Sequence, residues 1–191
     1  MNNAKPIIQH EVHFTYVYLF QAARWAIEQA ESGKELSDYP SMHSILASVH
    51  CIEAFLNTLG PQYFGTKWDT PGYNTPKEKI RAVLSHFGLK PADIQQQYDR
   101  YMLAIQIRDE LVHGRTHEIS RQTAKIQREI GSVQTNTDPL WLRHCHVKPA
   151  RLIYDDIIYL IEYFLEKSGQ SKYRLEFFSY GDGWIKYPEN T

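Results

Sequence analysis

Five segments of the chain repeat apolar residues at intervals of three and four, the spacing that places them on one face of an α-helix. A helix with such a face becomes stable by packing that face against other elements. The segments cover residues 9–31, 41–60, 75–88, 91–114 and 149–168. Four of them are long and one is short. We therefore predict an all-α fold, a bundle of four long helices plus a short one.

Capping and breaking residues at the segment ends support these boundaries. Gly60-Pro61 is a strong stop signal for the second helix. Thr75 is a good N-cap, and Pro76 suits the first turn of the short helix. Pro149 is expected to start the last helix for the same reason. Three of the five predicted helices therefore have a physical signal at one of their ends.

Two segments outside the helices favour β structure. Residues 140–148 alternate in side-chain character, which predicts a strand. Residues 173–178 and 184–187 are rich in β-forming side chains and flank a Gly-containing turn signal at 179–183. We predict a small C-terminal β-hairpin over residues 173–187. The polar stretch that follows the third long helix has no clear period, so residues 115–148 are interpreted as an insert.

Length and composition favour one domain that covers residues 1–191. The chain is 42% hydrophobic, which is enough for a real core, and its formal net charge is −1. No apolar run approaches the roughly 20 residues that span a bilayer, and the start lacks the layout of a signal peptide. We expect a soluble cytoplasmic protein. The two cysteines, Cys51 and Cys145, lie in different contexts and are expected to be free thiols.

Positive charge gathers in the second half of the chain. Residues 108–151 hold eight Lys or Arg side chains against five carboxylates. A polyanion would meet this region first. The alternative is an ordinary solvated surface. The candidate RNA-binding residues lie in the insert: Arg115, Arg121, Lys125 and Arg128.

The end of the 91–114 helix is the one place where the sequence suggests chemistry. Arg108 and His113 lie five positions apart, about 140° around the axis and about 7.5 Å along it, and could flank a phosphate near the helix end. Gly114 suits the left-handed residue that ends a helix. A histidine can shuttle protons, and an arginine fork can clamp a phosphate. The alternative is structural: Arg108 pairs with Asp109 or Glu53, and His113 only caps the helix.

This motif resembles that of the HEPN superfamily, in which Arg and His are separated by four to six residues at the end of a long helix. The matching residues are Arg108, Asp109 in the polar position after the arginine, and His113. The second helix adds to the likeness, because its residues 48–57 resemble the stretch that sets a carboxylate against the motif arginine. Glu53 would then be the orienting partner. The resemblance covers roughly residues 9–168.

The resemblance implies a metal-independent endoribonuclease without a cofactor, active as a homodimer in which two motifs face each other and cut RNA. His113 would act as acid or base and Arg108 as the phosphate clamp. Asp109, one turn before His113, could hold the imidazole tautomer. The family also suggests a toxin or defence effector, with a cognate antitoxin protein as partner and no membrane. Alternatives are a non-catalytic dimerisation or interaction module and a nucleotide-binding sensor.

A metal centre is not expected. His144 and His146 would face the same side of a strand with the Cys145 thiol opposite, and two ligands do not make a site. A third ligand would have to come from His117 or His43. The sequence also lacks a Gly-rich phosphate loop, a Gly-x-Ser-x-Gly elbow and a His-Glu-x-x-His helix. These absences weaken nucleoside triphosphatase, esterase and metalloprotease interpretations.

Overall fold

The computed structural model describes residues 8–33, 37–114, 139–169 and 181–186. Within these ranges the protein is mostly helical, as predicted. The helices are α1 (Thr15–Glu31), α2 (Asp38–Phe64), α3 (Pro76–His86), α4 (Gln95–Val112), α5 (Leu140–His144) and α6 (Val147–Lys167). Two 3₁₀ turns, η1 (Gly65–Asp69) and η2 (Pro91–Ile94), precede α3 and α4. Every helix in these ranges is too short or too polar to cross a bilayer.

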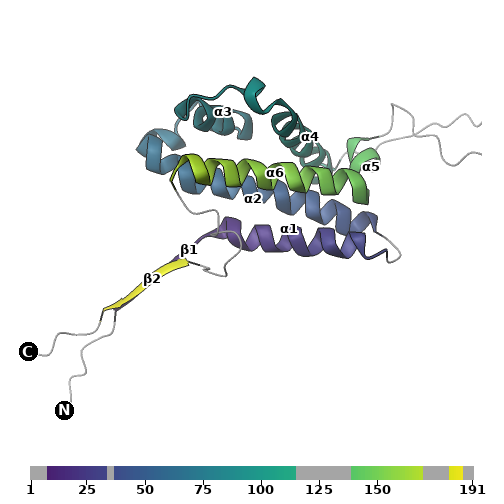
Figure 1. The fold of residues 1–191 in the computed structure, drawn as a ribbon, viewed down its shortest axis with the longest axis horizontal. Helices are drawn as coiled ribbons and strands as arrows, with labels where there is room; N and C mark the ends of the chain where they lie inside the picture. The colour runs from purple at the N-terminus through teal and green to yellow at the C-terminus, as the bar shows by residue number, and fades with distance from the viewer. Residues whose placement is uncertain (1–7, 34–36, 115–138, 170–180, 187–191) are drawn as a thin grey trace, which may run out of the picture.

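Helix α2 is the centre of the bundle. It packs against α1, α3, α4 and α6. In Figure 1, α1, α2 and α6 run alongside one another, and α3 and α4 lie on the side away from α1. The core between the helices is apolar, and its largest fully buried side chains include Trp68, Tyr16, Tyr101, Phe55 and Phe164. A residue on α2 can therefore face α3 and α4, and this is the side on which the candidate site forms.

Small side chains line the face of α2 that packs on α1. Ser44, Ser48 and Cys51 are fully buried there. The Ser44 hydroxyl donates to the backbone carbonyl of Ala23 at 3.1 Å, and the Cys51 thiol donates to that of Tyr16 at 3.2 Å. Because the distance between packed helices depends on the side chains at their contact, small residues let α1 and α2 approach closely.

Helix α2 does not stop at Gly60-Pro61, so that predicted boundary was wrong. The helix continues to Phe64 and ends at Gly65, which has a φ of 57°. Gly60 lies directly against the Trp68 ring, and a Cβ at this position would overlap the ring. The glycine is thus required by packing. Pro61 costs the helix one backbone hydrogen bond, a loss that the tertiary contacts of α2 offset.

The predicted strand at residues 140–148 was also wrong. Residues 140–144 form α5, and α6 begins at Val147, two residues before Pro149. The Glu110 carboxylate of α4 accepts a hydrogen bond from the Leu140 backbone N–H at 2.8 Å, which satisfies one of the free donors at the start of α5. Contact with α4 therefore overrides the short alternating pattern.

The ends of the described chain meet in a two-stranded antiparallel ladder. Strand β1 (Ile8–His13) pairs with β2 (Gly181–Lys186), with Ile8 opposite Lys186 and His13 opposite Gly181. The first helix consequently begins at Thr15 and not at residue 9. The predicted C-terminal hairpin is not confirmed, because its first strand, 173–178, lies outside the described residues. Residues 181–183, expected in its turn, belong to β2.

Candidate functional site

Glu53 on α2 and Arg108 on α4 meet across the helix interface. An Arg108 terminal nitrogen donates to Glu53 Oε1, while Arg108 Nε donates to Asp109 Oδ1 at 2.9 Å. The second terminal nitrogen lies 2.8 Å from the same Asp109 oxygen. The side chains of Arg108 and Glu53 are only 16% and 20% exposed. The contact between Glu53 and Arg108 expected from the sequence is therefore present.

The two carboxylates keep Arg108 charged. Burial opposes the charge of the guanidinium, but the negative charges of Glu53 and Asp109 and their hydrogen bonds outweigh that effect and raise the pKa of Arg108. Glu53 has a second neighbour, since His50 Nδ1 lies 3.6 Å from Glu53 Oε2. The Glu53 carboxylate thus lies between a permanent cation and an exposed imidazole. No pattern in the sequence singled out His50.

Tyr101 lies near this ion pair as a neutral, buried group. Its hydroxyl donates to the Pro76 carbonyl at 3.5 Å. Burial, helped by the charge of Glu53, raises the pKa of Tyr101 above its ordinary range. The phenol therefore stays protonated at any physiological pH. It is suited to holding α4 against the start of α3.

His113 is the C-cap of α4, and its backbone N–H donates to the Asp109 carbonyl at 3.0 Å. Gly114 follows with a φ of 39°, as its predicted role at the helix end requires. The His113 side chain is exposed. Over the described ranges of the chain, no hydrogen bond or ion pair joins its imidazole to another residue. The Asp109 carboxylate faces Arg108, and the expected contact with the His113 ring is absent.

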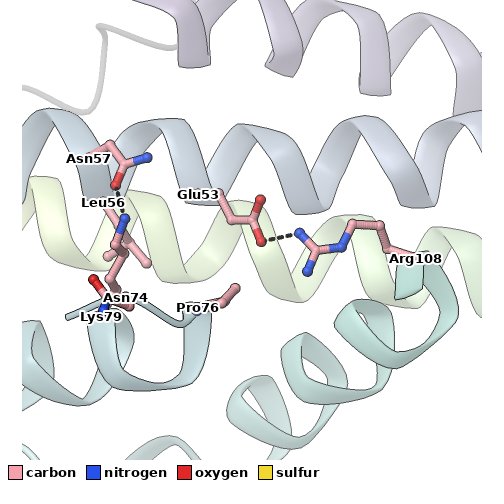
Figure 2. A pocket seen from close by; sticks show the side chains of 7 residues that line it. All are labelled: Glu53, Leu56, Asn57, Asn74, Pro76, Lys79 and Arg108. Carbon is pink, nitrogen blue, oxygen red and sulfur yellow. Dashed lines mark hydrogen bonds and ion pairs between the residues drawn. The ribbon is translucent and has the colours of Figure 1, made fainter. Parts of the chain in front are cut away.

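A pocket of about 210 Å³ opens beside the Arg108 pair. Figure 2 shows the side chains that line it: Glu53, Leu56, Asn57, Asn74, Pro76, Lys79 and Arg108. They come from α2, from the segment that leads into α3, from α3 itself and from α4. Arg108 and Glu53 are common to the pocket and the predicted site, whereas His113 and Asp109 are not among the lining residues.

Lys79 is held at the other end of this pocket. Its Nζ donates to Asn57 Oδ1 at 2.7 Å, and the Trp68 indole N–H donates to the same oxygen at 3.3 Å. Lys79 Nζ also lies 5.6 Å from the centre of the Trp68 ring, within the range of a cation–π interaction. Sequence reasoning missed Lys79, because only the fold brings α3 next to α2.

The predicted N-cap fixes the start of α3. The Thr75 hydroxyl accepts from the Glu78 N–H at 3.2 Å, and Glu78 Oε2 accepts from the backbone N–H groups of Thr75 and Asn74 at 2.9 and 3.1 Å. These bonds, first among them the one from the Thr75 backbone, lower the pKa of Glu78. The capping box therefore orients the turn that presents Asn74, Pro76 and Lys79 to the pocket.

The His144-Cys145-His146 segment lies at the junction of α5 and α6. His146 Nδ1 is 2.8 Å from Asp38 Oδ1, and Cys145 is buried, which raises the pKa of its thiol to about 12. Burial, with Arg143 and His146 nearby, lowers the pKa of His144. No group of three or more His, Cys, Asp or Glu side chains that could hold a metal occurs among the residues the structure describes. Cys51 and Cys145 are free thiols, as predicted.

The structure does not describe the candidate RNA-binding residues of the insert. Arg115, Arg121, Lys125 and Arg128 lie outside the described residues, as does His117. The site as described consists of the Arg108 pair, the pocket beside it and the exposed His113 at the end of α4.

Comparison of the chain with protein-family models, curated proteins and solved structures found no match.

Proposed function

We propose that the protein is a metal-independent endoribonuclease of the HEPN type, active as a homodimer. The observation that carries the proposal is the ion pair between Glu53 of α2 and Arg108 of α4, with His113 exposed at the end of the same helix. This is the relation between carboxylate, arginine and histidine that the family resemblance implies. The toxin or defence setting, an antitoxin partner and a cytoplasmic location belong to the same proposal and come from the resemblance alone.

The proposed reaction uses the 2′-hydroxyl of RNA as an internal nucleophile. A base removes the proton from this hydroxyl, and its oxygen forms a bond to the adjacent phosphorus. The bond from phosphorus to the 5′-oxygen breaks, and an acid protonates that oxygen, which leaves a 2′,3′-cyclic phosphate and a 5′-hydroxyl. His113 of one subunit acts as the base and His113 of the second subunit as the acid. Arg108 stabilises the negative charge that develops on the phosphorane.

Arg108 has donors left for this task. Its contacts with Glu53 and Asp109 use one N–H from each of its three nitrogens. A guanidinium carries five N–H donors, so each terminal nitrogen retains one. A phosphate can therefore bind Arg108 while Glu53 and Asp109 hold its orientation. The two carboxylates keep the arginine side chain in one conformation before substrate arrives.

The dimer supplies the second histidine in this mechanism. Val112, beside His113, is 63% exposed. A second copy that packs across this helix end would cover Val112 and bring its own His113 close. The proposed dimer and the proposed catalysis therefore share one geometric requirement: the two His113 side chains must lie close together.

The rival function is a non-catalytic interaction or nucleotide-binding module. The observation that favours it is that Arg108 already has two carboxylate partners in the free protein. In this function the ion pair would only hold α2 against α4. The two functions differ in whether removal of the His113 side chain affects RNA cleavage.

Cleavage of single-stranded and structured RNA in the presence of EDTA separates these functions. We expect the wild-type protein to cut RNA, and His113→Ala to lose at least about a hundredfold in rate. His43→Ala is the matched control, because His43 is an exposed histidine on α2. We expect a similar loss for Arg108→Lys, which keeps the charge and removes the fork. Cleavage that survives His113→Ala at full rate would end the proposal.

A further inference from the structure

The pocket extends along one turn of α2. Glu53, which binds Arg108, lies at one end, and Asn57, which binds Lys79, lies at the other. Four residues of an α-helix rise about 6 Å. Arg108 and Lys79 are therefore held at opposite ends of one pocket by two residues that lie one turn apart on α2 (Figure 2).

The two cations differ in how their charges are balanced. Arg108 is paired with two carboxylates, whereas the contacts of Lys79 are the Asn57 amide oxygen and the Trp68 ring, both neutral. No carboxylate forms an ion pair with Lys79 in the part of the chain that the structure describes. Among the charged lining residues, Lys79 is thus the cation whose charge no paired carboxylate offsets, while Arg108, Glu53 and Asp109 together carry one negative charge. An ammonium also has three donors, so two remain for a ligand.

The space between the cations suits a nucleoside. Pro76 provides partly exposed apolar surface above the buried Leu56, and Asn57 and Asn74 provide exposed amides. The Asn57 oxygen already accepts from two donors, so its NH₂ group is the part left for a ligand. RNA bases are read through hydrogen bonds to their edges. At about 210 Å³ the pocket is smaller than the sites of roughly 300–1,000 Å³ that hold drug-sized ligands. It can therefore hold no more than one nucleoside.

We propose that this pocket is a subsite for one nucleotide of the RNA strand. Arg108 takes the phosphate at the cleaved bond, Lys79 binds the neighbouring phosphate, and the nucleoside between them occupies the pocket. The proposal rests on the proposed function for the identity of the strand. It assigns Lys79 to binding and leaves the proton transfers to His113.

The salt dependence of RNA binding tests the role of Lys79. Lys79→Gln removes the charge and keeps a donor for Asn57, so the fold should persist. We expect KM to rise about tenfold with kcat unchanged, and the slope of log affinity against log salt to fall by about 0.7, the value for one lost phosphate contact on a single strand. Lys77→Gln, an exposed lysine on the same helix, should change neither. Lys79→Arg should restore both.

An unchanged salt slope in Lys79→Gln would overturn the subsite. A lower kcat at unchanged KM would also overturn it, because that result would place Lys79 in the chemistry.

Small ligands test the subsite without cleavage. A ribonucleoside 3′,5′-bisphosphate has a nucleoside between two phosphates, so it should bind more tightly than either monophosphate or inorganic phosphate. In an NMR titration of the full chain, we expect shifts at the lining residues and about tenfold weaker binding to Lys79→Gln. His113→Ala should bind as the wild type does. Equal affinity for inorganic phosphate would overturn the subsite, since the pocket walls would then contribute nothing.

These readouts keep the two proposals apart. Binding of the bisphosphate that depends on Lys79, in a protein that does not cut RNA, would end the nuclease and retain the subsite. Cleavage that depends on His113 and ignores Lys79 would do the reverse.

Discussion

Helix α4 carries two arginine–carboxylate pairs that differ in their surroundings. Arg100 lies 2.5 Å from Asp156 of α6, whose carboxylate also accepts bonds from the amides of Gln96 and Gln97 at 3.4 to 3.5 Å. Asp156 is only 9% exposed. The second pair, Arg108 with Glu53 of α2, borders a pocket and shares its arginine with Asp109. The same two chemical groups therefore occur once enclosed by partners and once beside open space.

A structural ion pair and a candidate site differ in how completely their charged groups are satisfied. In the Arg100 pair the carboxylate receives donors from three residues of α4, so it is fully satisfied and ties α6 to α4. In the Arg108 pair the arginine is held by two carboxylates and still retains two N–H donors, and it lines the pocket. Both arginines lie in the same helix, but only Arg108 is followed five residues later by a histidine. In the structure, the pocket and the neighbouring exposed histidine distinguish the Arg108 pair from the Arg100 pair.

Removing Asp156 should have the largest effect on stability. Asp156→Ala leaves Arg100 without its partner in a largely buried position, so we expect a loss of about 3 kcal/mol in the free energy of unfolding. Urea denaturation followed by circular dichroism measures it. RNA cleavage per folded molecule should not change. A loss of activity in the folded variant would contradict the division between the two pairs.

Glu53→Gln should have a smaller effect on stability and a clear one on activity. Asp109 remains as a partner for Arg108, so we expect a loss of only about 1 kcal/mol in the free energy of unfolding. The loosened guanidinium should lower kcat about tenfold. Denaturation and steady-state cleavage measure the two quantities separately. If Glu53→Gln destabilises the protein as much as Asp156→Ala and leaves kcat intact, the Arg108 pair is structural too.

The smallest expected effect concerns the capping box that orients the Lys79 end of the pocket. The native pKa of Glu78 lies below its ordinary value of 4.5. Its contribution to stability is therefore present above that ordinary value and is lost as the pH falls through the lowered native pKa. Glu78→Gln should remove this part of the acid dependence. Stability curves of wild type and variant that stay parallel between neutral and acid pH would show that the box does not depend on the charge.

Local signals in the sequence predicted a large part of the fold. The helical period gave the all-α class, and Thr75 and Gly114 marked helix ends correctly, because caps depend only on nearby residues. The contact between Glu53 and Arg108 was also expected. These features share a short-range cause or a recognised motif.

The predictions that failed, and the residue that was missed, depend on contacts between residues far apart in the sequence. Gly60-Pro61 reads as a stop unless the Trp68 ring on Gly60 is known. Residues 140–144 read as a strand unless the contact with Glu110 is known. Lys79 carried no signal, because its role depends on the packing of α3 on α2. In each case the deciding contact joins residues that no local pattern connects.

The position of Trp68 has a practical consequence. Its indole lies over the backbone of Gly60, bonds to Asn57 and faces the ammonium of Lys79. A ligand that displaces or re-aims that ammonium changes the electric field at the ring, and indole emission is sensitive to such fields. A chain in which the other three tryptophans are replaced by phenylalanine would thus carry its own fluorescent probe of occupancy, which allows stopped-flow kinetics without a dye-labelled substrate.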